Sequence, residues 1–273
     1  MGEFADLIKH NYSAQIVLAF FAALVAWWAT LYVSGASADA LQAWAAAYQI
    51  VAFFGACVGF TIANHWGGFQ SVIGRATIAF SFGLLLQCFG QTSYSFYIYY
   101  LNQPVPYPSI GDIGYFGSIF AYLYGALALS RAAGVHVSLK SYRGQLLAFL
   151  LPLLMLVLSY QFFLRGYEFD GTQPLKTFLD FGYPFGQALY VSVALLAYLL
   201  SRNVLGGMMR MPILVFIGAL VLQYFSDFTF LYQATAGTWY AGGMNDLLYL
   251  VSYLAMTLAL LYIGHVFVKI QKS

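Results

Sequence analysis

The residues best suited to chemistry form a short pattern that occurs three times, an aspartate followed three residues later by a tyrosine. On a helix, residues three apart share one face, so each aspartate and its tyrosine point the same way. Carboxylates beside aromatic rings suit a cation, or an amphiphile with a polar head and an apolar tail. The three copies are Asp112-Ile113-Gly114-Tyr115, Asp180-Phe181-Gly182-Tyr183 and Asp246-Leu247-Leu248-Tyr249.

Each pair continues as a stripe along its helix, at the spacing i, i+3, i+7 and i+10. Polar groups at this depth are unfavourable against lipid, so we expect the three faces to line a shared interior that opens outward. The stripes are Asp112, Tyr115, Ile119 and Tyr122; Asp180, Tyr183, Gln187 and Tyr190; and Asp246, Tyr249, Tyr253 and Met256.

Two further helices place polar residues four apart, Gln87 and Gln91 in one and Gln223 and Asp227 in the other. A carboxylate in the middle of a membrane span is unfavourable by roughly 2.5–3.5 kcal/mol, and no apolar run has Lys or Arg near its middle. Asp227 is therefore the most informative single residue. Two interpretations stay open for it, a ligand or ion site and a polar network that holds helices together.

The elements that must position these residues are apolar helices. The chain has 273 residues, 62% hydrophobic and 7% charged, which excludes a soluble enzyme and is typical of an integral membrane protein. Its apolar runs are continuous over about 20 residues, which predicts helices and not a barrel. We predict an all-α polytopic protein, a single transmembrane domain over 1–273, with helices at about 13–34, 42–64, 76–101, 111–133, 145–165, 177–201, 212–236 and 244–268.

The distribution of positive charge predicts the orientation, because loops rich in Lys and Arg stay in the cytoplasm. The termini and the loops on their side contain nine of these residues, whereas the opposite side has Arg165 and Lys176. We therefore expect both termini in the cytoplasm and the protein in the cell (inner) membrane. The net charge of +2 is too small to indicate a nucleic-acid partner.

The three aspartate-tyrosine pairs are separated by 68 and 66 residues, which is the length of one helical hairpin. Leu129-Ser130-Arg131 and Leu200-Ser201-Arg202 repeat at a similar distance. Such repeats keep the orientation of each hairpin. They predict tandem hairpins related by an axis near the membrane normal.

Other features indicate less chemistry. The histidines on the side of the termini, His65, His136 and His265, lack the spacing of a metal site, and no cofactor motif is present, so we predict neither a metal nor a cofactor. Gly55 and Gly59 form a Gly-x-x-x-Gly pattern that permits close helix packing. Packing within the bundle is preferred here to contact between two copies, which would make an oligomer.

Three segments resemble the multi-helix membrane regions that precede bacterial and archaeal diguanylate cyclase, phosphodiesterase and histidine kinase domains. The first is residues 104–115, which reads Pro-Val-Pro-Tyr-Pro-Ser-Ile-Gly-Asp-Ile-Gly-Tyr; the others are Gly182-Tyr183-Pro184, and Ser226-Asp227 with Gly237 to Gly243 and Asp246. The family often has an aspartate where Gln187 stands here. This resemblance implies a sensory module. Only eight residues follow His265, so we expect no output domain and a signal that leaves through a cytoplasmic partner.

The sequence therefore predicts a stand-alone ligand-binding or sensory membrane module for a membrane lipid or a cationic amphiphile. One alternative is an intramembrane hydrolase, because Phe225-Ser226-Asp227 is similar to the lysoplasmalogenase type; Asp227 would then act with Asp180 or Asp246. A second alternative is a small-solute transporter. The predicted site consists of Gln91, Asp112, Tyr115, Asp180, Tyr183, Gln187, Gln223, Asp227, Asp246 and Tyr249.

Overall fold

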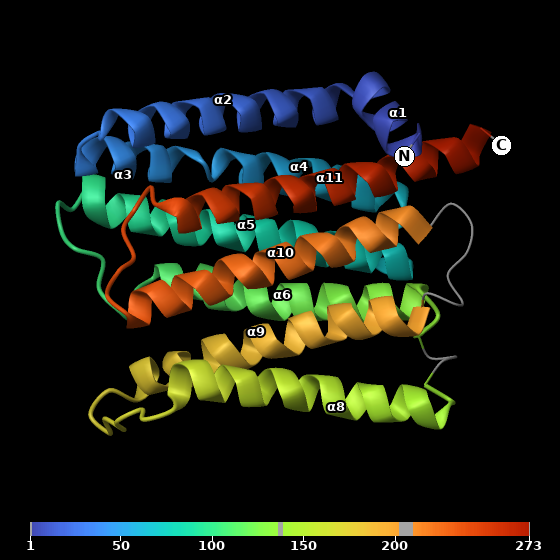
Figure 1. Ribbon diagram of the computed structural model, residues 1–273. Helices are drawn as coiled ribbons and strands as arrows, with labels where there is room; N and C mark the ends of the chain where they lie inside the picture. Colours follow the sequence, from blue (N-terminus) through green and yellow to red (C-terminus); the bar gives the residue numbers. More distant parts are fainter. Residues whose placement is uncertain (1, 136–138, 202–209, 273) are drawn as a thin grey trace.

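The computed structural model describes residues 2–135, 139–201 and 210–272, and this part of the chain is helical, with no strand. Long helices lie side by side as one bundle (Figure 1). Eight of them are long and apolar enough to cross a membrane, which confirms the predicted number of spans and a multi-pass membrane protein. His136 and Arg202, both used in the sequence predictions, lie outside the described residues.

The helices run in chain order with short connections. Their bounds are α1 Gly2–His10, α2 Tyr12–Ser34, α3 Ala38–Ala47, α4 Ile50–His65, η1 Gly68–Gln70, α5 Val72–Tyr99, α6 Gly111–Ala132, α8 Tyr142–Ser159, η2 Tyr160–Leu164, α9 Pro174–Ser201, α10 Arg210–Thr235 and α11 Met244–Lys272. η1 is a single 3-10 turn, and η2 is a π-helical turn that continues α8.

Local sequence explains where several helices begin. Asn11 Oδ1 accepts a hydrogen bond from the Ala14 N–H at the start of α2, and serines cap α3, α5 and α8 in the same way. α2 ends at Gly35, whose left-handed φ of 61° a side chain would disfavour. These caps place the span boundaries within a few residues of the predicted ones.

Two elements differ from the prediction. The span predicted as one helix over 42–64 begins at Ala38 and is broken into α3 and α4 at Tyr48 and Gln49. No Gly or Pro marks this break. The N-terminal segment, for which no helix was predicted, forms α1, a short helix with an apolar face that buries Leu7.

α11 lies in the middle of the bundle, packed against α4, α10 and α2, while α5 packs against α4 and α6. α9 packs between α8, α10 and α6. α8 lies at the edge, and Gly144 and Ser159 are the residues that it buries. α5, α6, α10 and α11 lie in the middle of the bundle and contain most of the predicted polar residues, while α9, beside the edge helix α8, contains the others (Figure 1).

Glycines allow the closest helix contacts. Gly55 faces Thr257 of α11 and Gly59 faces Ser81 of α5, so closely that a Cβ at either position would overlap the facing hydroxyl. The Gly-x-x-x-Gly pattern therefore packs inside the bundle, as the preferred interpretation expected. Gly90 of α5 similarly accommodates the ring of Tyr115.

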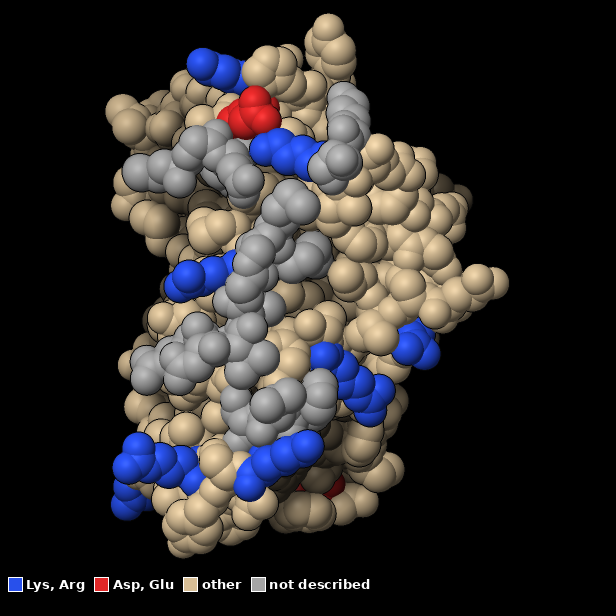
Figure 2. Space-filling model, turned by 90° about the vertical axis from the view of Figure 1, so that its right-hand side faces the viewer, with Lys and Arg blue, Asp and Glu red and all other residues tan. Residues whose placement is uncertain are grey.

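The bundle has two chemically different ends. Both termini lie at one of them, which we call the termini end (Figure 1); the other, the loop end, has the loops around residues 100–110, 165–173 and 236–243. Lys and Arg side chains are scattered over the termini end, with few acidic ones among them (Figure 2). The described basic residues there are Lys9, Arg75, Arg131, Lys140, Arg143, Arg210 and Lys269.

An acidic residue joins α1 to α11 at the termini end. Asp6 pairs with His10 at 3.1 Å, with His265 at 3.3 Å and with Lys269 at 3.6 Å. Desolvation would raise the pKa of Asp6, but the positive charges of these three partners outweigh it and lower the pKa. His265, one of the histidines noted in the sequence, thus contacts Asp6 at this end of the bundle.

Candidate functional site

A cavity opens at the loop end, enclosed by α5, α6, α9, α10 and α11 with the loops around residues 105–109 and 235–241. We call it the main cavity. Its volume is about 590 Å³, within the roughly 300–1,000 Å³ that small-molecule sites occupy. Eleven aromatic residues line it, together with four aspartates: Asp112, Asp180, Asp227 and Asp246.

The structure brings the predicted site residues together at this cavity. The first three positions of each stripe line the wall, and the fourth, Tyr122, Tyr190 or Met256, is buried in the adjoining core. Gln223 is the exception, because it lies behind Asp227 and does not reach the cavity. The predicted residues that line it are Gln91, Asp112, Tyr115, Asp180, Tyr183, Gln187, Asp227, Asp246 and Tyr249.

Asp227 is held by three side chains from three helices. Its Oδ2 accepts a hydrogen bond from the Tyr190 hydroxyl at 2.7 Å, and its Oδ1 accepts bonds from Gln223 Nε2 and the Tyr249 hydroxyl, both at 3.0 Å. Gln223 is in turn fixed by Ser252, whose hydroxyl donates to Gln223 Oε1 at 2.7 Å. These donors compensate a carboxylate that is only 5% exposed, and they tie α9, α10 and α11 together.

Asp112 and Gln91 connect α6 to its neighbours. The Tyr183 hydroxyl of α9 donates to Asp112 Oδ1 at 2.7 Å, and the Ser109 backbone N–H donates to Oδ2 at 2.7 Å. The Tyr115 hydroxyl donates to Gln91 Oε1 at 2.8 Å, while Gln91 Nε2 donates to the Ala45 carbonyl in α3. Seven of the ten predicted site residues therefore bond to one another, in three separate groups.

Asp180 lies at the mouth of the cavity among residues that the sequence prediction missed. It accepts hydrogen bonds from the Tyr107 hydroxyl at 2.9 Å and the Tyr167 hydroxyl at 2.7 Å, and Lys176 Nζ lies 2.7 Å from its Oδ2. Burial, followed by the hydrogen bond to Asp180, raises the pKa of Tyr107. The i, i+4 spacing of Lys176 and Asp180 is the signal that could have identified the lysine.

Asp246 differs from the other three carboxylates. Its Oδ2 accepts a hydrogen bond from the Gly242 backbone N–H at 2.7 Å, whereas no described residue donates to its Oδ1; the residue itself lines the cavity. Tyr48 and Tyr94 lie close enough to interact with its charge. Trp239 packs edge-on against Tyr94, with ring centroids 6.0 Å apart. Asp246 thus presents one free carboxylate oxygen to an aromatic-lined space.

The charges around the cavity do not balance. Lys176 is the one cation among the described residues that line it, against the four carboxylates. In the part of the chain that the structure describes, these carboxylates form no group of three or more metal-binding side chains. The described lining of the cavity therefore has more carboxyl groups than cationic side chains.

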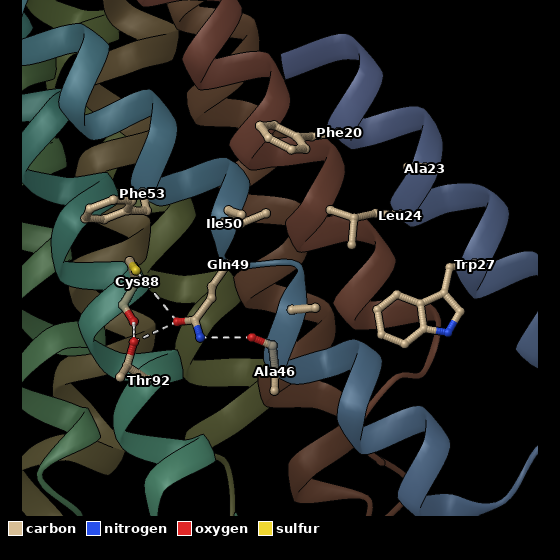
Figure 3. Close-up of a pocket in the computed structure, with 11 residues that line it drawn as sticks. Phe20, Ala23, Leu24, Trp27, Ala46, Gln49, Ile50, Phe53, Cys88 and Thr92 are labelled. Carbon is tan, nitrogen blue, oxygen red and sulfur yellow. Dashed lines mark hydrogen bonds between the residues drawn. The ribbon is translucent and has the colours of Figure 1, made fainter. Parts of the chain in front are cut away.

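A second hollow, a shallow apolar groove of about 560 Å³, lies on the outer surface between α2, the α3–α4 break and α5 (Figure 3). The amide of Gln49 in its wall has hydrogen-bond partners nearby: the Thr92 hydroxyl donates to Gln49 Oε1 at 2.8 Å, and Gln49 Nε2 donates to the Ala46 carbonyl at 2.9 Å. Phe20 and Trp27 point into the groove (Figure 3). It offers apolar contact and no free charge, so the candidate site is the main cavity.

Comparison of the chain with protein-family models, with curated proteins and with solved structures finds no match.

Proposed function

We propose that the protein is a ligand-binding module of sensory type, embedded in the cell (inner) membrane, whose main cavity takes a small amphiphile with a cationic head group. One observation supports this most directly: Asp112, Asp227 and Asp246 border a single cavity and have no cationic partner among the described residues. A cation in the cavity would neutralise their combined field.

The aromatic wall supports an amphiphile over a simple ion. Tyr48, Tyr94 and Trp239 border the cavity near Asp246, and rings of this kind attract an organic ammonium group by its charge. Phe163, Phe230 and Leu231 provide apolar surface elsewhere in the wall. A quaternary or primary ammonium with an alkyl or aryl tail satisfies both kinds of wall.

We infer that the loop end faces outward, because the basic residues gather at the opposite end and positive loops stay in the cytoplasm. The common register of the three stripes also supports tandem hairpins. α11 runs from Asp246 at the cavity to Lys272 at the termini end. A ligand bound at the outer side could therefore signal to a cytoplasmic partner by shifting α11.

A binding role also agrees with the environment of Asp227 better than acid-base catalysis does. Both of its oxygens accept hydrogen bonds from fixed side chains, Tyr190, Gln223 and Tyr249. A general acid or base needs an oxygen within reach of the reacting group. The intramembrane hydrolase stays an outcome of the test below.

The experiment is native mass spectrometry of the purified protein in dodecyl maltoside, titrated with decyltrimethylammonium and, separately, with neutral decyl glucoside. We expect the cationic probe alone to bind, with one molecule per chain. In Asp246→Asn the amide oxygen keeps the cap on Gly242 but loses the charge, so affinity should fall at least about tenfold. Asp39→Asn removes an exposed aspartate of the same end, and it should leave the affinity unchanged.

Three results would contradict the proposal. Equal binding of the neutral probe would mean that the cavity selects only an apolar tail. An equal loss in the Asp246 and Asp39 variants would mean that general surface charge attracts the probe. A membrane lipid that the wild type cleaves, and that Asp227→Asn leaves intact, would identify the hydrolase instead.

A further inference from the structure

The mouth of the main cavity contains a ready-made cage for an ammonium group. Lys176 Nζ lies 2.7 Å from Asp180 Oδ2, 5.8 Å from the ring centroid of Tyr107 and 5.9 Å from that of Tyr167. Both tyrosine hydroxyls donate to the same carboxylate. A carboxylate with aromatic faces beside it is the arrangement that recognises ammonium ligands.

This cage also joins two loops to α9 at the entrance of the cavity. Tyr107 belongs to the loop before α6, Tyr167 to the loop after η2, and Lys176 and Asp180 to the first turns of α9. The lysine side chain is 38% exposed and that of Asp180 16%, which places the pair at the boundary between cavity and solvent. One lysine thus occupies the place where an entering cation would first meet a carboxylate.

We infer that Lys176 is an internal competitor for the ligand's head group. The cage of Asp180, Tyr107 and Tyr167 is then a second cation subsite, at the entrance, and an ammonium ligand enters by replacing the lysine there. Lys176 can withdraw, because its long stem is able to carry the charge to solvent. This inference rests on the proposed function, since it presupposes that the cavity takes a cationic amphiphile.

If Lys176 competes with the ligand, removing its charge should change the affinity for the cationic probe more than removing another positive charge at the loop end does. Lys176→Met keeps the stem but removes the charge, so decyltrimethylammonium should bind about tenfold more tightly, as expected when a partly exposed ion pair and two ring contacts no longer compete. Lys176→Arg should bind like the wild type. Arg165→Gln removes the other positive charge of the loop end, from an exposed site, and it should change the affinity less than twofold.

The test is equilibrium binding of radiolabelled decyltrimethylammonium to each variant in dodecyl maltoside, with Lys176→Gln as a second charge-removing variant should the methionine variant fail to fold. Adding Asp180→Asn to Lys176→Met should abolish the gain, because the subsite then has no charge. Wild-type binding without any gain in Lys176→Met and Lys176→Gln, or an equal gain in Arg165→Gln, would overturn this inference and leave the proposed function standing. Absence of binding in the wild type and in every variant would overturn the proposed function itself.

Discussion

Gly114 offers the sharpest test of how the bundle positions its polar wall. It lies on α6 against α5, where a Cβ would overlap the Leu86 carbonyl oxygen and come 2.7 Å from the Gly90 nitrogen. Both obstacles are backbone atoms of α5, so no rotamer change can make room. A Cβ in ordinary van der Waals contact lies 3.4 Å or more from its neighbours. To reach that distance from the Gly90 nitrogen, Gly114→Ala must move the two helices apart by about 0.7 Å.

The magnitude follows from what crosses the same interface. Overpacking of this kind lowers stability by about 1–3 kcal/mol. Two hydrogen bonds of 2.8 Å, Tyr115 to Gln91 and Gln87 to Ser118, span α5 and α6 and would be stretched, at about 0.5–1.5 kcal/mol each. The higher helix propensity of alanine offsets up to about 1 kcal/mol of this loss in the free energy of unfolding. We therefore expect the free energy of unfolding to fall by about 1–6 kcal/mol.

The assay is equilibrium unfolding in mixed micelles of dodecyl maltoside and sodium dodecyl sulfate, followed by circular dichroism. Gly218→Ala is the matched control, because Gly218 is an exposed position inside α10 with no atom within 4 Å of an added Cβ. The control should unfold at the wild-type detergent fraction or slightly above it. If Gly114→Ala and Gly218→Ala unfold together, the close α5–α6 contact is not what holds the polar wall.

Two further predictions concern single polar groups. Tyr190→Phe should lower the free energy of unfolding by about 1–3 kcal/mol, because Asp227 Oδ2 loses its donor in a buried site; exposed Tyr198→Phe should have no effect in the same unfolding assay, and an equal effect would contradict the argument. Asp6→Asn should be less stable than the wild type at pH 6, since the folded protein holds the pKa of Asp6 below its ordinary value of 3.8. That contribution is fully present above the unfolded pKa and is lost as the pH falls through the folded pKa, so the difference between the two proteins should shrink as the pH falls below 3.8. A difference that stayed constant over that range would argue against the ion-pair cluster.

The spans could be predicted from the sequence because run length and hydropathy determine them almost alone. Two features were not predicted, the break between α3 and α4 and the short helix α1. The α3–α4 break at Tyr48 and Gln49 has no Gly or Pro signal, and there the Gln49 side chain accepts a hydrogen bond from Thr92 of α5 and donates one to the Ala46 carbonyl of α3. α1 was missed because it is too short for a span and is docked by Asp6, whose partners His265 and Lys269 are far away in sequence.

The candidate site was predictable to the extent that helix periodicity determines which residues share a face. The stripes beginning at Asp112, Asp180 and Asp246 converge on one cavity for that reason. Tyr107 and Tyr167 were missed because they lie in loops, whose positions depend on tertiary contacts that no periodicity encodes. Gln223 was placed in the interior correctly, but its depth behind Asp227 depends on how α10 is rotated in the bundle.

The repeated aspartates have a local role that must be separated from any function. Asp112 accepts the N–H of Ser109, and Asp246 accepts that of Gly242, so each uses one oxygen to cap the start of its helix. Capping accounts for two of the three copies, because Asp180 lies inside α9 and bonds to the side chains of Tyr107, Tyr167 and Lys176 instead. In the two capping aspartates it uses only one oxygen of each pair. Tyr183 occupies the second oxygen of Asp112, whereas no described residue donates to the second oxygen of Asp246. Asp246→Asn keeps one oxygen for the cap on Gly242 and replaces the other oxygen by an uncharged NH2 group. A loss of cation binding in that variant would therefore report on the cavity and not on the helix.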